Sequence, residues 1–216
     1  MPRVTEEYIQ RRRRQILDAA WRCFAHNGFH ATTMDDVIEA AGASPSVVYR
    51  WFRGKDELVT AVVVEALSGL LDAQRELLLR DPPPTLAEAV EHILVTAAAR
   101  TTRDGEDLSA LAVQTWTEAL RNPEVHQVVT GGLEQLRDGF AELVRRHQDL
   151  GTIPASVDAD AAARPLLALF PGFVVQRVLL GPEDPLVYAR AVSSILLCGG
   201  GAAAAPADVA TAGGSS

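Results

Sequence analysis

Residues 33–55, TMDDVIEAAGASPSVVYRWFRGK, decide how the rest of the chain is interpreted. Thr33 is followed three residues later by Asp36, which is the spacing of a capping box at the start of a helix. Gly42 supplies a turn, and Pro45 is suited to open a second helix because it lacks the N–H that a first helical position leaves unpaired. Helix, glycine turn and helix is the layout of a helix-turn-helix DNA reader.

Farther along the chain, apolar residues recur at the three- and four-residue steps of amphipathic helices. Thr85 and Glu88 repeat the capping-box spacing, and Asn122 precedes a helix that begins at Pro123. No stretch alternates between apolar and polar residues as a half-buried strand does. We therefore expect an all-α fold with about nine helices.

Glycine and proline mark where helices are expected to end or bend. The first helix is expected to follow a disordered arm, residues 1–8, and to end at Gly28. The polar segment 101–107 is interpreted as a loop. Gly131-Gly132 predicts a kink within one long helix, and Pro171-Gly172 is expected to bend or break another.

The net charge of −8 is unevenly distributed along the chain. Residues 1–60 hold nine basic and eight acidic side chains, whereas residues 61–216 hold eleven and twenty. The acidity therefore belongs to the second part. A nearly neutral N-terminal part can still present a basic face, so the charge distribution permits DNA binding.

Other functional classes are disfavoured. The apolar run at 166–175 holds ten residues, against about 20 for a membrane span. The N-terminal residues are polar and lack the apolar core of a signal peptide, which favours a cytoplasmic protein. Cys23 and Cys198 have neither a paired spacing nor a nucleophile signature. His26 and His30 are spaced like a helical metal pair, but a helix-ending glycine lies between them. No catalytic residue, cofactor or metal is predicted, and an enzyme is not expected.

Residues 16–58, ILDAAWRCFAHNGFHATTMDDVIEAAGASPSVVYRWFRGKDEL, resemble the TetR (tetracycline-repressor) family of bacterial transcription regulators. The shared features include the A-A-G turn, the Tyr-x-x-Phe pattern of Tyr49 and Phe52, and the K-x-E-L motif that starts at Lys55. The resemblance implies a homodimer whose two helix-turn-helix heads bind double-stranded DNA at a palindromic operator. It also implies a helical body that binds a small-molecule effector, which releases the repressor from its operator.

The resemblance and the helical pattern divide the chain into three parts. Residues 1–54 are predicted to form a three-helix, helix-turn-helix DNA-binding domain, and residues 55–198 a larger domain for ligand binding and dimerisation. The tail, residues 199–216, is low in sequence complexity and is expected to be disordered.

The first turn of the second helix in such a motif is the part that reaches base edges. Val47 is expected to contact a thymine methyl, and Arg50 to bind guanine or phosphate. Lys55 resembles the phosphate-contacting lysine of the family. The predicted DNA-binding residues are Thr33, Ser44, Pro45, Ser46, Val47, Tyr49, Arg50, Trp51 and Lys55.

The aromatic residues of this segment have two possible roles. Tyr49 and Trp51 are expected to donate hydrogen bonds to backbone phosphates, with core packing as the alternative for each. Helical spacing assigns Val48 and Phe52 to the core, together with Trp21 of the first helix.

The family resemblance also implies an effector pocket and a dimer of the last two long helices. The pocket candidates are His92, Gln114, Trp116 and Phe140, although Trp116 is equally well explained as a core residue. The last two helices carry more apolar surface than one helix pair would hide, and Phe173→Asp is expected to yield monomers. The predicted interface residues are Leu166, Phe170, Phe173, Val174, Val178, Val187, Ala191 and Ile195.

The predicted function is a ligand-responsive, DNA-binding transcriptional repressor. The alternative is a helical adaptor whose helix-turn-helix packs against another protein. The adaptor explains the acidic second part but not the clustering of Arg50, Trp51 and Lys55 beside the turn.

Overall fold

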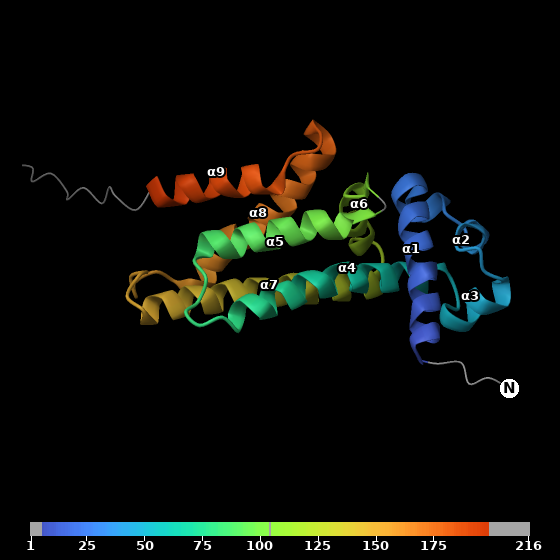
Figure 1. Cartoon of the computed structure of the whole chain (residues 1–216), viewed down its shortest axis with the longest axis horizontal. Coiled ribbons are helices and arrows are strands. Elements are labelled where there is room, and N and C mark those ends of the chain that lie inside the picture. The colour runs from blue at the N-terminus through green and yellow to red at the C-terminus, as the bar shows by residue number, and fades with distance from the viewer. Residues whose placement is uncertain (1–5, 104, 199–216) are drawn as a thin grey trace, which may run out of the picture.

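The computed structural model describes residues 6–103 and 105–198, and nine α-helices account for most of this part of the chain (Figure 1). The helices are α1 (Glu6–Ala31), α2 (Met34–Ala40), α3 (Pro45–Trp51), α4 (Lys55–Leu78), α5 (Leu86–Thr101), α6 (Ala110–Ala119), α7 (Pro123–Asp149), α8 (Ala159–Leu180) and α9 (Pro185–Cys198). The predicted all-α fold is confirmed. The predicted disordered tail lies outside the described residues.

The molecule is elongated, with the helix-turn-helix segment at one end (Figure 1). The helices α4, α5 and α7 run along the long axis, and α9 lies along α5. The first helix, α1, stands across one end of α4, and α2 and α3 lie beyond it. The short helix α6 lies at the junction, where it contacts both α1 and α7.

Capping residues start several helices where the sequence predicts them. The Thr33 N–H donates to Asp36 Oδ2 over 2.7 Å, and the Asp36 N–H donates back to Thr33 Oγ1 over 3.2 Å. Thr85 and Glu88 form the same pair of bonds at the start of α5. These bonds from the threonine backbone and hydroxyl lower the pKa of both carboxyls. Both predicted capping boxes are therefore confirmed.

Two clusters of apolar side chains make the core. One cluster combines residues of the four helices α1, α2, α3 and α4 with residues of α6 and α7. It contains Trp21, Val48 and Phe52, as predicted. The other joins α4, α5, α7, α8 and α9. Because α4 contributes to both clusters, it connects the helix-turn-helix end to the rest of the molecule mechanically.

Two local predictions near helix ends are wrong. Residues 6–8 are helical rather than part of an arm, and an acidic residue such as Glu7 is favourable in the first turn of a helix. The segment predicted as a loop contains a short antiparallel hairpin, β1 (Thr102–Arg103) and β2 (Glu106–Asp107). Gly28, at φ 82°, interrupts α1 as predicted, although one more helical turn follows it.

The helix α7 crosses Gly131-Gly132, where the sequence predicts a kink, without interruption. Two glycines of α7 instead allow α4 to approach closely. A Cβ at Gly132 would lie 2.9 Å from Leu67 Cδ1, and a Cβ at Gly139 would overlap the Gln74 side-chain amide.

The predicted break in α8 does not occur, because the helix continues through Pro171. A proline inside a helix costs about 3 kcal/mol. Burial of Phe173 and Val174, which follow it, contributes about 1.5–3 kcal/mol each and offsets this cost. Among the described residues, α8 is also the helix whose length and composition would allow it to cross a membrane, but Ala163 and Phe173 are buried in the helical core.

Candidate DNA-binding surface and effector cavity

The recognition helix α3 presents most of its predicted DNA-binding residues to solvent. Ser44, Pro45, Ser46, Tyr49 and Arg50 are all exposed. Ser44 occupies the N-cap position, but its hydroxyl makes no capping bond and lies 3.1 Å from the hydroxyl of Ser46. Ser44 therefore does not cap α3 with its side chain, and both hydroxyls remain at the surface.

The opposite face of α3 packs against the core. Val48 and Phe52 are buried, whereas Val47 and Trp51 are half-buried against the same cluster. Tyr49 is 47% exposed, which rules out core packing as its main role. Trp51 is half-buried, so one part of its surface packs against the core cluster and another part faces solvent.

Thr33 and Lys55 have intramolecular partners in the free protein. The Thr33 hydroxyl donates to Asp36 Oδ2 over 2.8 Å, so the capping box already uses its proton. Lys55 Nζ donates to the backbone oxygen of His30, over 3.0 Å, at the end of α1. Arg13 of α1 lies over the ring of Phe52, 5.6 Å from its centroid, beneath α3.

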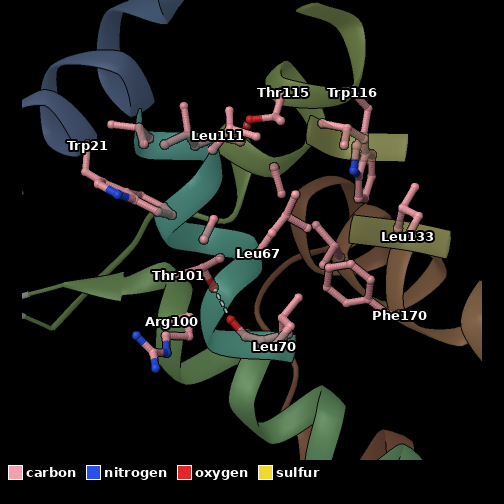
Figure 2. Close-up of a pocket in the computed structure, with 17 residues that line it drawn as sticks. Trp21, Leu67, Leu70, Arg100, Thr101, Leu111, Thr115, Trp116, Leu133 and Phe170 are labelled. Carbon is pink, nitrogen blue, oxygen red and sulfur yellow. Dashed lines mark hydrogen bonds between the residues drawn. The ribbon is translucent and has the colours of Figure 1, made fainter. Parts of the chain in front are cut away.

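A small apolar cavity of about 60 Å³ lies where α1, α4, α5, α6, α7 and α8 meet. Figure 2 shows Trp21 on one side of it and Trp116 with Phe170 on the other. The rings of Trp116 and Phe170 meet edge to face, with centroids 6.3 Å apart. The lining residues are Trp21, Val62, Val63, Ala66, Leu67, Leu70, Ala97, Arg100, Thr101, Leu111, Ala112, Thr115, Trp116, Val129, Leu133, Phe170 and Val174.

Of the four predicted pocket residues, Trp116 lines this cavity and the other three do not. Phe140 is buried in the core cluster of α4, α5 and α7–α9. Gln114 lines a separate cleft between α1 and α6, beside Gly28. His92 is half-buried elsewhere on α5. A helical pattern shows which residues share a face, but not which face turns toward a space enclosed by six helices.

The sequence did not predict the contacts between α1 and the rest of the helical body. His26 Nε2 lies 3.2 Å from Glu106 Oε1 in the hairpin, and His30 Nε2 lies 3.5 Å from Glu118 Oε2 on α6. Both histidines come after Trp21 in the sequence, and no local motif points to partners about 80 residues later. These pairs connect the end of α1 directly to the region beside the cavity.

The hairpin is also tied to α8. Arg177 Nε donates to Asp107 Oδ2 over 2.6 Å, and the Ser109 N–H donates to Asp107 Oδ1 over 2.9 Å. Burial raises the pKa of Asp107, but the bonds from Ser109 and Arg177 outweigh it, so the pKa lies below its ordinary value. The Ser109 hydroxyl also contacts that of Thr101, a cavity-lining residue, at 3.0 Å.

Half of the residues predicted at the dimer interface are buried inside the protomer. These are Leu166, Phe170, Phe173 and Val174. Phe170 and Val174 line the cavity, and the Phe173 ring packs 5.2 Å from that of Tyr188.

The remaining predicted interface residues lie nearer the surface. Val187 and Ile195 are 56% and 72% exposed, Ala191 is exposed, and Val178 is half-buried.

Two family models match the chain. Residues 16–62 match the bacterial regulatory proteins of the tetR family, and residues 84–197 match the C-terminal domain of BetI-type transcriptional repressors. The chain belongs to the TetR family. The resemblance seen in the first quarter of the sequence is confirmed, and the second match extends it through the helical body.

Relatives of known role agree with this assignment. The chain is 27% identical to the HTH-type transcriptional regulator UidR of Escherichia coli K12 over 73% of this chain and 76% of UidR. It is 28% identical to the HTH-type transcriptional regulator TtgR of Pseudomonas putida over 85% of this chain and 88% of TtgR. The structure of Salmonella enterica GusR matches with a TM-score of 0.69 and 28% identity, covering 91% of this chain and 98% of GusR.

TetR-family regulators are soluble proteins that bind DNA and small-molecule effectors, typically as dimers. This TetR-family chain is therefore a ligand-responsive, DNA-binding transcription regulator and not an enzyme.

Proposed function

We propose that the chain is a cytoplasmic repressor that binds a palindromic operator as a homodimer and leaves it when an effector enters the apolar cavity. The observation that supports this is the position of Trp21. It belongs to α1, within the proposed DNA-binding domain of residues 1–54, yet it lines a cavity whose other walls come from the proposed body, residues 55–198. An effector would change operator affinity by its differential affinity for two arrangements of α1.

The proposed DNA contacts divide into base readers and phosphate contacts. We propose that the first turn of α3 and Arg50 read base edges in the major groove, and their exposure supports this. The proposed phosphate contacts, which position the protein without reading the sequence, are Thr33, Tyr49, Trp51 and Lys55. Lys55 would exchange its bond to the His30 carbonyl for a phosphate.

The proposed dimer surface is revised to the exposed side of α8 and α9. Val178, Val187, Ala191 and Ile195 are retained from the sequence prediction. Val175 and Leu179 are added because they are 36% and 75% exposed on α8.

Arg50→Ala tests the DNA-binding role. An operator is first selected from random DNA with the wild-type protein, and affinity is then measured by fluorescence anisotropy across a salt series. Loss of one arginine contact to a base or phosphate is expected to weaken binding about 10–100-fold. Arg75→Ala is the matched control, because Arg75 is an exposed arginine of α4 that pairs with Asp72.

Two outcomes would contradict the proposal. Equal loss of operator affinity in both variants would show that Arg50 makes no specific contact with DNA. Failure of the wild-type protein to bind any selected DNA in a salt-dependent way would favour the adaptor. With the operator in hand, release by a panel of metabolites tests the effector role of the cavity.

A further inference from the structure

The apolar cavity has a polar neighbour, and the two hollows share one residue, Arg100. The second hollow is a cleft between α1, α4 and the end of α5. One face of α1 borders both, since Leu17 lies in the cleft and Trp21, one turn later, in the cavity. The residues that line the cleft are Gln10, Arg13, Arg14, Leu17, Glu65, Ala99, Arg100 and Thr102.

The cavity itself provides almost no polar partners for a ligand. Arg100 is the one charged side chain among the described residues that line it. The Thr101 hydroxyl donates to the Ala97 carbonyl over 3.0 Å, and the Thr115 hydroxyl donates to the Leu111 carbonyl over 2.9 Å. A polar group buried there without a partner would cost free energy, so the occupant is apolar over most of its length.

The cleft, by contrast, is basic. Its lining contains three arginines, Arg13, Arg14 and Arg100, and one carboxylate, that of Glu65, so its charged groups carry a formal net charge of +2. Arginine binds carboxylates through two parallel, charge-assisted hydrogen bonds. A cationic head group would be repelled at the same place.

A glycine of α4 makes room for Arg100. A Cβ at Gly69 would overlap the Arg100 guanidinium, so the end of this side chain lies against α4 beside that glycine. Figure 2 shows the guanidinium directed away from Trp116 and Phe170, toward the side on which α1 lies. Arg100, an exposed residue, thus lies at the boundary between the apolar cavity and the basic cleft.

We propose that the effector of this regulator is an amphipathic anion, whose apolar body fills the cavity and whose carboxylate binds Arg100 where the cavity meets the basic cleft. The inference rests on the proposed function of the cavity as an effector site. Because Arg13 and Arg14 lie on α1 and Arg100 on α5, the head group would bring the DNA-binding domain and the body together in one particular arrangement.

Three probes with the same ten-carbon chain and different head groups test this: decanoate, decanol and decyltrimethylammonium. Binding is followed by tryptophan fluorescence in a Trp51→Phe background, which leaves the two cavity tryptophans, Trp21 and Trp116, as the signal. Decanoate is expected to bind most tightly. Arg100→Met is expected to weaken decanoate about tenfold or more and to leave decanol within about twofold.

Two further variants sharpen the test. Gly69→Ala keeps the charge of Arg100 but displaces its guanidinium, so it should weaken decanoate selectively as Arg100→Met does. Arg75→Met removes a surface arginine of α4 and should change none of the three affinities. Normal decanol binding by each variant shows that its cavity is intact.

The proposal is overturned if decyltrimethylammonium binds best, if the three probes bind equally, or if Arg100→Met weakens decanoate and decanol alike. Operator release is measured separately. Release by a neutral or cationic metabolite alone would overturn the anionic class and leave the proposed function standing. Arginine-dependent decanoate binding by a chain that binds no DNA would overturn the proposed function and leave the anionic class of ligand standing.

Discussion

At the scale of single residues, Asp107 connects the hairpin to α8. Its carboxylate accepts from Arg177, whose side chain is 12% exposed. Asp107→Asn is expected to lower the free energy of unfolding by about 2 kcal/mol at neutral pH, because a charge-assisted hydrogen bond to a largely buried arginine is lost. Urea denaturation followed by circular dichroism measures the difference.

The same variant has a predicted pH dependence. The folded pKa of Asp107 is lowered, so its contribution is present above the unfolded pKa, about 3.9, and is lost as the pH falls through the folded pKa. The gap between wild type and variant should therefore shrink below about pH 4. Asp160→Asn is the control, since Asp160 pairs with Arg145 at the exposed surface and should change stability by at most about 1 kcal/mol. A gap independent of pH would contradict the role of the charge.

Residues whose role depends on their sequence neighbours were predicted well. Thr33 and Asp36 cap α2 as expected, because both partners lie within one helical turn. By contrast, the sequence did not predict the residues that line the cavity, apart from Trp116. Trp21, Arg100 and Phe170 come from α1, α5 and α8, and only the packing of these helices brings them to one space.

At the scale of helices, the contact between α4 and α7 depends on Gly139. The Gln74 side chain fills the space beside it and donates from Nε2 to the Leu136 carbonyl over 2.6 Å. Gly139→Ala should displace this buried amide and break its bond, destabilising the fold by about 2–3 kcal/mol. Chemical denaturation provides the measurement.

Gly131→Ala, in the same helix, provides a control of opposite sign. No atom beyond the neighbouring backbone lies within 4 Å of a Cβ built there. Alanine should therefore stabilise α7 by about 0.5–1 kcal/mol through its higher helix propensity. If both substitutions stabilised the protein, close packing at Gly139 would not be the reason for a glycine there.

The glycines of α7 show why the helices themselves were predicted more reliably than the kinks and breaks expected inside them. Caps such as Asn122 and the interrupting Gly28 act locally, and the structure has both where expected. The local sequence predicts a kink at Gly131-Gly132. It does not show that Gly132 packs against Leu67, because Leu67 lies on another helix, 65 residues earlier. The effect of Pro171 likewise depended on burial against other helices, which its own sequence context does not show.

At the scale of the whole molecule, the hydrophobic pattern of α8 was not enough to predict which of its residues form a dimer surface. It is apolar around most of its circumference, so the sequence does not tell which face turns inward. Four predicted interface residues, including Phe173, are buried within the protomer. Phe173→Asp would place a charge in the core and destabilise the fold, and it therefore does not test dimerisation.

Leu179→Glu together with Ile195→Glu provides a test that spares the core, since these side chains are 75% and 72% exposed. If the outer side of α8 and α9 is the dimer surface, two buried carboxylates per protomer should yield monomers by light scattering, with an unchanged helical circular dichroism spectrum. Operator affinity should fall about 100-fold or more, because two linked heads bind with avidity that a single head lacks. Leu120→Glu, 83% exposed between α6 and α7, should remain dimeric and bind normally. A double variant that stays dimeric would place the interface elsewhere on the molecule.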